Sequence, residues 1–284
     1  MSARLHVDLI LAPGAALVLP PNASRHVQVL RLQPGAAICL FDGRGGEAAA
    51  TVLQIGRREV QVRVDALDPA QRELPLAVTL ALGVPANDRM DALVEKATEL
   101  GVATIVPLFC ERSVLRLDGD RAAKRLAHWQ AVAVAACEQC GRNRVPAVEP
   151  LAALPAWLRT LAPLPLPAAG RPSPRWLLSL HAAATLPLAW AVQAGQPSSA
   201  VLLSGPEGGL AVSEEALALA TGFQPVGLGA RVLRADTAPL AALAWLSVQT
   251  ADEAPDGTAV RAGAGAARAH GAGRPPHANA ESAA

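Results

Sequence analysis

Gly205-Pro206-Glu207-Gly208-Gly209 is the first of two segments that decide how this sequence is interpreted. It follows the apolar run 201–204 and precedes a segment with helical spacing, so we expect a tight loop at the carboxyl end of a buried strand. Open α/β sheets bind ligands at that edge. The second segment, Leu228-Gly229-Ala230-Arg231-Val232-Leu233-Arg234-Ala235-Asp236-Thr237, follows another predicted strand, 223–228. Two such loops at adjacent strand ends favour a nucleotide-like ligand held between them.

Other interpretations of these loops are weaker. The Gly-Lys-Ser/Thr ending of a phosphate-binding P-loop is missing from 205–209. Gly227-x-Gly229 resembles the start of a dinucleotide fingerprint, but no third glycine opens a helix in register. A plain strand-to-helix turn remains the structural alternative for 205–209.

From residue 76 onward, predicted strands alternate with predicted helices, which favours a parallel α/β sheet. The predicted strands are 76–83, 104–108, 176–180, 201–204 and 223–228. Helices are expected from Asp88 to Gly101, over 122–140, from Ser213 to Gly222 and over 239–250. Asp88 and Ser213 are predicted helix N-caps, with Glu214 and Glu215 in the first turn, where the macrodipole favours carboxylates.

Residues 1–72 are β-rich and predict a compact barrel-like domain, with strands at 37–42, 47–55 and 60–66. The turn 43–46 contains three glycines and needs positive φ angles. Residues 73–250 form the predicted α/β domain. Eight prolines between Pro146 and Pro174 predict a loop-like or lightly structured insertion in it. Residues 251–284 hold one large aliphatic side chain, Val260, and predict a disordered tail.

Composition excludes several classes of protein. Hydrophobic residues make up 51% of the 284 residues and charged ones 17%, which is ample for a buried core. No apolar run reaches the ~20 residues of a membrane span, and charged residues near the start argue against a signal peptide. We therefore expect a soluble, cytoplasmic chain with no membrane partner. The net charge of +1 does not decide for or against a nucleic-acid partner.

The cysteines give little support to a metal or redox centre. Cys137-x-x-Cys140 has the spacing of zinc ligands, but neither Cys39 nor Cys110 supplies a second pair. The motif also closes a long helix instead of opening one. We expect buried thiols and no metal.

Together, the motifs resemble the RsmE family, SPOUT-class methyltransferases that act on N3 of a uridine in 16S ribosomal RNA. The resemblance covers roughly residues 20–250, with all motifs in family order. They are GPEGG (205–209), LGARVLRADTAPLAAL (228–243), DRMD (88–91) through KATELG (96–101), ERS (111–113), EQCGR (138–142), and His26-Val27 with VLRL (29–32). The chain departs from the family pattern at Asp236, where glutamate is usual, and at Pro239.

The resemblance implies a PUA-like RNA-binding β-barrel followed by a SPOUT-type parallel sheet with a carboxyl-terminal trefoil knot. It implies S-adenosylmethionine as cofactor, held in a bent form by backbone groups of 203–209 and 227–234. Family members act as homodimers with a shared active site, so a homodimer is expected. The implied partner is 16S ribosomal RNA or the small ribosomal subunit, methylated at uridine 1498 in the usual rRNA numbering.

The resemblance also assigns candidate residues. The expected cofactor-binding residues are Leu203, Gly205, Pro206, Glu207, Gly208, Leu228, Gly229, Leu233, Arg234 and Thr237. Uracil N3 must approach an anion before it attacks, so the site needs cationic stabilisation, and Arg231 and Arg234 supply it. Glu207, the third candidate catalytic residue, would orient an arginine or accept the proton. The expected RNA contacts are Arg25, Arg31, Arg112 and Arg142.

Two alternatives stay open at this point. One is a SPOUT enzyme that acts on transfer RNA, for example at a ribose oxygen. The other is a non-catalytic RNA-binding protein built on the same scaffold, which the intact GPEGG segment argues against.

Overall fold

The computed structural model describes residues 2–86, 89–114, 119–161, 173–180, 186–187 and 197–251. All of them belong to one compact unit. Asp88, predicted as a helix cap, lies outside the described residues. So do residues 162–172 of the predicted insertion and the predicted tail beyond residue 251.

An amino-terminal sheet contains five strands in the order β1-β3-β4-β5-β2. They are β1 (Ala3–His6), β2 (Ala16–Val18), β3 (Ala37–Phe41), β4 (Glu47–Ile55) and β5 (Val60–Asp68). β1 pairs with β3 in parallel, and the other pairs are antiparallel. Inward-facing residues such as Leu5, Leu40, Val52 and Val62 form its core. The glycine turn before β4 has positive φ angles at Gly43, Gly45 and Gly46, as predicted.

Three elements of this region were not predicted: β1, β2 and the helix α1 (Pro21–Val29). Helix α1 is hard to predict from the sequence because Pro20 and Pro21 stand at its start, although proline is well tolerated in a first helical turn. Ala23 and Val27 are buried one helical turn apart. Between them, Ser24 is also buried, donating its hydroxyl to the Leu19 carbonyl and accepting the Val60 N–H.

A second, parallel sheet has the order β11-β13-β10-β12-β6-β7-β8, with β9 also pairing with β7. Its strands are β6 (Ala77–Gly83), β7 (Thr104–Phe109), β8 (Ala147–Val148), β9 (Ala152–Ala153), β10 (Arg175–Leu178), β11 (Leu186–Pro187), β12 (Ser199–Ser204) and β13 (Gln224–Gly227). All of its strand pairs are parallel, as the alternating pattern predicted. The five predicted strands all form, within about two residues of their expected ends.

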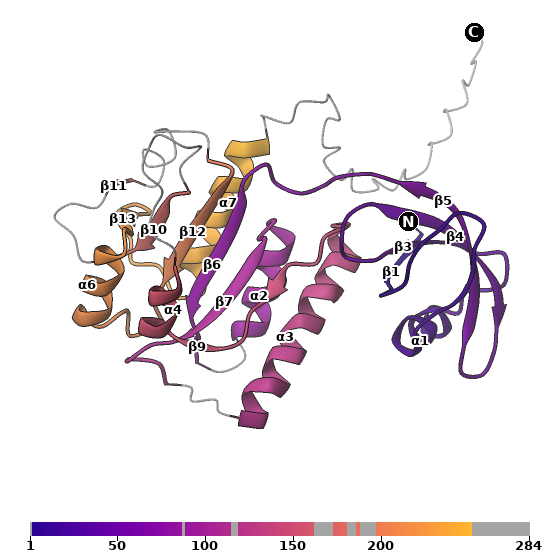
Figure 1. Cartoon of the computed structure of the whole chain (residues 1–284), viewed down its shortest axis with the longest axis horizontal. Helices are drawn as coiled ribbons and strands as arrows, with labels where there is room; N and C mark the ends of the chain where they lie inside the picture. The colour runs from indigo at the N-terminus through magenta and orange to yellow at the C-terminus, as the bar shows by residue number, and fades with distance from the viewer. Residues whose placement is uncertain are drawn as a thin grey trace, which may run out of the picture. The chain divides into compact units, whose positions relative to one another are not determined.

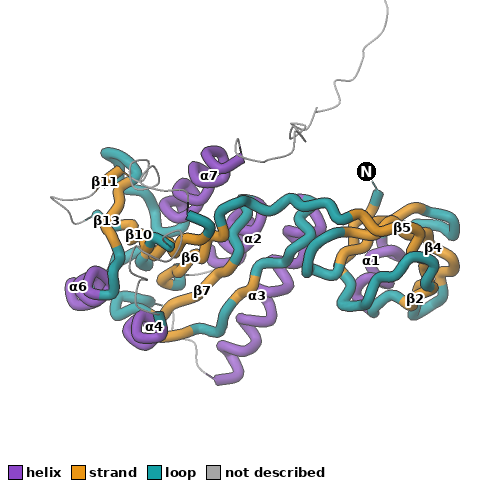
Figure 2. The backbone as a smooth tube through the Cα atoms, turned by 45° about the horizontal axis from the view of Figure 1, so that its top comes forward, coloured by secondary structure: helices purple, strands orange, loops and turns teal. Residues whose placement is uncertain are grey.

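Helices cover both faces of the parallel sheet (Figures 1 and 2). Along β6, Leu80 and Leu82 face one core and Ala81 faces the other. The first core is shared with α2 (Arg89–Glu99), α3 (Gly119–Cys140) and α7 (Thr237–Ala251). The second is shared with α4 (Leu154–Thr160) and α6 (Val212–Ala220). None of the described helices is long and apolar enough to span a membrane.

Two predictions about local structure were wrong. Residues 147–160 are not a loop-like insertion, because β8 and β9 extend the sheet and α4 buries Leu154 and Leu158 against it. Ser213 does not cap α6, which begins one residue earlier, at Val212. The carboxylate of Glu214 instead accepts the N–H of Ala211, the residue before the helix.

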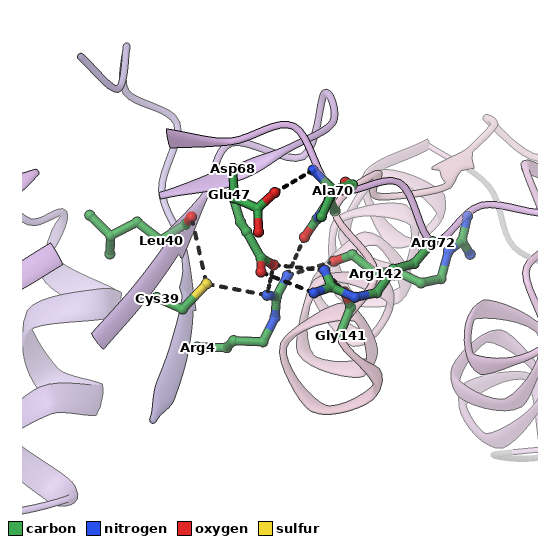
Figure 3. A network of polar contacts seen from close by, with 10 residues as sticks. Arg4, Cys39, Leu40, Glu47, Asp68, Ala70, Arg72, Gly141 and Arg142 are labelled. Atoms are coloured by element: carbon green, nitrogen blue, oxygen red, sulfur yellow. Dashed lines mark hydrogen bonds and ion pairs between the residues drawn. The ribbon is translucent and has the colours of Figure 1, made fainter. Parts of the chain in front are cut away.

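A polar network joins the amino-terminal sheet to the segment after α3 (Figure 3). The Arg4 guanidinium on β1 donates to the Glu47 carboxylate and to the carbonyl oxygen of Arg142. Arg72 donates to both Glu47 oxygens, at 2.7 and 3.0 Å. Hydrogen bonds from Arg72, opposed by burial but reinforced by Arg4, lower the pKa of Glu47 from 4.5 to about 2.

This pKa predicts an acid-sensitive stability term. A carboxyl whose pKa is lowered on folding stabilises the fold fully above its ordinary pKa, and that stabilisation is lost as the pH falls toward the folded-state value. We expect Glu47→Gln to reduce the free energy of unfolding at pH 7 by up to about 3 kcal/mol. The gap between variant and wild type should shrink as the pH falls from about 4.5 to about 2. Urea unfolding across that range measures it, and a gap that does not depend on pH would contradict the assignment.

Candidate functional site

A cavity of about 620 Å³ opens at the carboxyl edge of the parallel sheet. Its walls are the loop 205–210 after β12, the loop 227–235 after β13, and residues 178–180 at the end of β10. The two segments singled out in the sequence therefore face one another across a single space, as predicted. Volumes of this size are typical of sites for small ligands and cofactors.

The loop after β12 depends on two close backbone contacts. A Cβ on Gly83, the last residue of β6, would lie 2.4 Å from Pro206 Cδ and 2.5 Å from Pro206 N. A Cβ on Gly205 would lie 2.9 Å from the Leu210 nitrogen. Only glycine fits at either position. The Gly209 N–H then donates to the Pro206 carbonyl at 2.8 Å and closes the turn.

Glu207 ties this loop to the connection between β6 and α2. Its Oε1 accepts the Ala86 N–H at 3.0 Å and lies 3.4 Å from the Arg89 guanidinium. Both side chains are about one-third exposed and border the cavity. Of the two roles considered for Glu207, this geometry favours orienting an arginine.

Glu214 joins the same loop to the turn after β7. Its carboxylate is buried, and Oε1 accepts the Glu111 N–H at 2.8 Å while Oε2 accepts the Ala211 N–H at 2.9 Å. Next to Glu111, the Arg112 guanidinium donates to the Gly208 carbonyl at 2.9 Å. Arg112 is thus held at the cavity wall by its own hydrogen bond to Gly208 and by the bond of its neighbour Glu111 to Glu214.

We predict that Glu214→Gln destabilises the fold. The amide offers one acceptor oxygen where the carboxylate offered two, so one buried N–H faces a second donor, at a cost of about 1–3 kcal/mol. Urea unfolding measures the loss. Ser213→Ala is the matched control in the same helical turn, because Ser213 is exposed and should change stability by less than about 0.5 kcal/mol. A Glu214→Gln protein as stable as wild type would contradict the bridging role.

The loop after β13 carries the predicted catalytic arginines. Arg231 and Arg234 are exposed side chains that border the cavity. The Arg234 carbonyl accepts the N–H groups of Thr237 and Ala238, which starts α7 and fixes the Arg234 backbone. Asp236 is partly buried, and its Oδ1 has no hydrogen-bond partner in the described part of the chain.

Most of the predicted site residues border the cavity. They are Gly205, Pro206, Glu207, Gly208, Leu228, Gly229, Leu233, Arg231, Arg234 and Arg112. Leu203 and Thr237 do not line it: Leu203 is buried in the sheet, and Thr237 is the first residue of α7. Arg25 and Arg31 are exposed at α1 and just beyond it, outside the cavity.

Arg142 does not fit the role predicted from its motif. Its side chain is 5% exposed, and its guanidinium is bound to the Glu73 carboxylate. Nη1 donates to the carbonyls of Thr98 and Val102, both at 2.9 Å. These buried contacts occupy the groups that an RNA phosphate would need, so Arg142 is a structural residue here.

Several cavity residues were missed in the sequence. They are Arg89, Leu178, Ser179, Leu180 and Glu215. Ser179 donates its hydroxyl to Glu215, which links the end of β10 to the first turn of α6. The predicted strand 176–180 could have indicated Leu178, Ser179 and Leu180, because its carboxyl end had to lie at the same sheet edge as the two loops.

The cysteines lie outside this site. All four are free thiols, with Cys110 and Cys137 buried and Cys39 and Cys140 partly exposed. Burial raises the pKa of Cys137 to about 12. Among the described residues, no group of three His, Cys, Asp or Glu side chains is arranged to hold a metal.

Comparison with known proteins gives the family. A family model described as an RNA methyltransferase domain matches residues 72–247, and one described as an RNA methyltransferase PUA domain matches residues 19–65. The ribosomal RNA small subunit methyltransferase E of Synechocystis is 35% identical over 84% of this chain and 76% of its own length. The Bacillus subtilis protein of the same name is 32% identical over 79% and 86%. The chain belongs to the ribosomal RNA small subunit methyltransferase E family.

A solved structure of that family agrees with the fold. The enzyme from Neisseria gonorrhoeae, crystallised with S-adenosyl methionine, superposes with a TM-score of 0.78 at 36% identity, covering 88% of this chain and 98% of its own. The amino-terminal sheet is thus part of a PUA-like domain, and the parallel sheet is that of a SPOUT-type methyltransferase. The knot and the domain boundary at residue 72 stay predictions.

Proposed function

We propose that this protein transfers the methyl group of S-adenosylmethionine to N3 of a uridine in 16S ribosomal RNA. The observation that carries the proposal is the cavity at the carboxyl edge of the sheet, which two glycine loops enclose and two exposed arginines border. Membership of the small subunit methyltransferase E family supports ribosomal RNA as the substrate.

The cavity suits S-adenosylmethionine in size and chemistry. It combines apolar walls at Leu178, Leu180 and Leu228 with the glycine-rich backbone of 205–209. The apolar walls suit the adenosine, and the polar backbone groups suit the charged amino acid part of the cofactor. The proposed binding groups are the predicted cofactor residues that border the cavity, namely Gly205, Pro206, Glu207, Gly208, Leu228, Gly229, Leu233 and Arg234. The cofactor supplies an electrophilic methyl group on a sulfonium.

The chain's own groups would then handle the uracil. Arg231 and Arg234 place fixed positive charge beside the position where N3 loses its proton, and so stabilise the developing anion. Glu207 orients Arg89 toward the cavity, and the proton of N3 is released to water. Positioning for in-line transfer accounts for much of the remaining rate enhancement.

We also propose that the protein forms a homodimer and that its methyltransferase domain contains the trefoil knot. Leu180 and Val232 are 73% and 76% exposed, yet both border the cavity. Large apolar side chains at a site's edge are typical of a surface that a second subunit covers. We propose a second copy of this chain as that partner, in the cytoplasm, with the small ribosomal subunit as the assembly on which the enzyme acts.

Nucleoside analysis of cellular 16S RNA tests the function. Cells that lack this gene should lose one 3-methyluridine, and the wild-type gene should restore it. Unchanged 16S RNA with a lost modification in transfer RNA would favour the related transfer-RNA enzyme. No change in any RNA, with RNA binding intact, would favour the non-catalytic protein.

A further inference from the structure

The longest described helix, α3, carries a basic face that the site does not use. Arg121, Lys124 and Arg125 are spaced by three and one residues, so they lie on one side of the helix. Arg121 and Lys124 are exposed and Arg125 is partly exposed. The opposing charges of α3 are few: its acidic residues are Asp120 and Glu138.

The three cations have no ion pair within the described part of the chain, although several other surface cations do. Arg63 pairs with Asp65, Arg44 with Asp8, and Lys96 with Glu95 and Glu99. Arg121 also lies in the first turn of its helix, where the macrodipole disfavours a cation. Three neighbouring cations without an ion pair, one of them at a position that helix stability does not favour, indicate a binding surface.

The position of α3 links two regions that are already predicted to meet RNA. It is the next helix in the chain after β7, whose carboxyl end lies at the edge that holds the cavity and Arg112. At its far end, Glu138 accepts the His6 N–H of β1 at 2.9 Å and lies 3.7 Å from His26 Nδ1 of α1. With 22 residues, the helix is about 33 Å long and runs from the sheet edge to the PUA-like domain (Figure 1).

We propose that Arg121, Lys124 and Arg125 form a short phosphate-binding track for the RNA substrate in the first two turns of α3, the helix that runs on to the PUA-like domain. The inference rests on the proposed function for the identity of the RNA, and on charge complementarity for the contact. His128 lies one turn further along, but its Nε2 is 2.7 Å from Asp91 Oδ2, so the ring is already engaged within the protein. Arg121, Lys124 and Arg125 themselves carry no aromatic ring, and phosphate contacts of this kind position an RNA without reading its sequence.

The test is RNA binding as a function of salt, measured apart from methyl transfer. The probe is the purified small ribosomal subunit, and the variant combines Arg121→Gln, Lys124→Gln and Arg125→Gln. We expect roughly tenfold weaker binding near physiological salt and a log–log salt slope smaller by about two. Affinity for S-adenosylmethionine and the melting temperature should stay unchanged. The control is Lys96→Gln with Arg159→Gln, two surface cations outside the PUA-like domain and the cavity lining, which should keep the wild-type slope.

The outcomes separate this inference from the proposed function. Equal slopes for wild type and the α3 variant would overturn the track, whether or not the protein makes 3-methyluridine. If the α3 variant shows the expected smaller salt slope but the wild-type protein methylates no uridine, the proposed function is overturned. The phosphate-binding track would then still stand. A wild-type protein that does not bind the subunit would overturn both.

Discussion

Arg234→Ala should lower the rate of methyl transfer about a hundredfold and leave affinity for S-adenosylmethionine nearly unchanged. Loss of a transition-state contact to charge costs roughly 3 kcal/mol, which corresponds to that factor. Cofactor affinity should persist because we expect the loops to hold the cofactor mainly through backbone groups, which the substitution leaves in place. Arg234→Lys should recover part of the rate, since a point charge lacks the planar fork of the guanidinium.

The structure already weakens the competing explanation, in which Arg234 braces the loop through an ion pair. Among the described residues, Glu207 pairs with Arg89 instead, and Asp236 Oδ1 has no hydrogen-bond partner. The Arg234→Ala protein should therefore melt at the wild-type temperature. Arg159→Ala on α4 is the control, an exposed arginine away from the cavity. Joint loss of stability and cofactor binding would restore the bracing role, and full activity would exclude both roles.

Gly83→Ala is expected to disable the site from a position that no cofactor touches. The added methyl group would lie 2.4–2.5 Å from the Pro206 ring and nitrogen, so the 205–209 loop must move. Overpacking of this kind costs about 1–3 kcal/mol, and a displacement near 1 Å costs about a hundredfold in rate. Calorimetric titration with S-adenosylmethionine, together with single-turnover rates, should show both affinity and rate reduced.

A suitable control separates the clash from ordinary glycine strain. Gly14 has a φ of +82°, and no atom lies within 4 Å of the place that an added methyl group would take, so Gly14→Ala costs backbone strain alone, roughly 1–2 kcal/mol. It should lower the melting temperature without changing cofactor affinity. If Gly83→Ala binds the cofactor as tightly as Gly14→Ala does, the close contact does not shape the site.

The sequence predicted the parallel sheet because predicted strands alternate with predicted helices from residue 76 onward. The same logic placed the two glycine loops at one edge, and the structure puts them around one cavity. Helix α1 was missed because Pro20 and Pro21 resemble a break in structure, while its two buried apolar residues, Ala23 and Val27, give too short a period to stand out.

The roles of single residues that the sequence did not predict depend on contacts between residues that are far apart in the chain. Arg142 has the appearance of an RNA-binding arginine until Glu73 and two carbonyls, 40–69 residues away in the chain, enclose it. Glu214 was interpreted through the helix macrodipole alone, because its partner Glu111 lies 103 residues away. Gly83 carried no signal, since what excludes a side chain there is Pro206. Local patterns predicted elements and loops, whereas burial and long-range pairing decided what single side chains do.

The most direct test of the central claim is the identity of the methylated nucleoside. Purified protein, S-adenosylmethionine with an isotopically labelled methyl group and purified small ribosomal subunits are incubated together, and the 16S RNA is digested to nucleosides for mass spectrometry. The label should appear in 3-methyluridine with the wild-type protein, and only weakly with Arg234→Ala. Label in a ribose-methylated nucleoside, or none in 16S RNA, would contradict the proposed function.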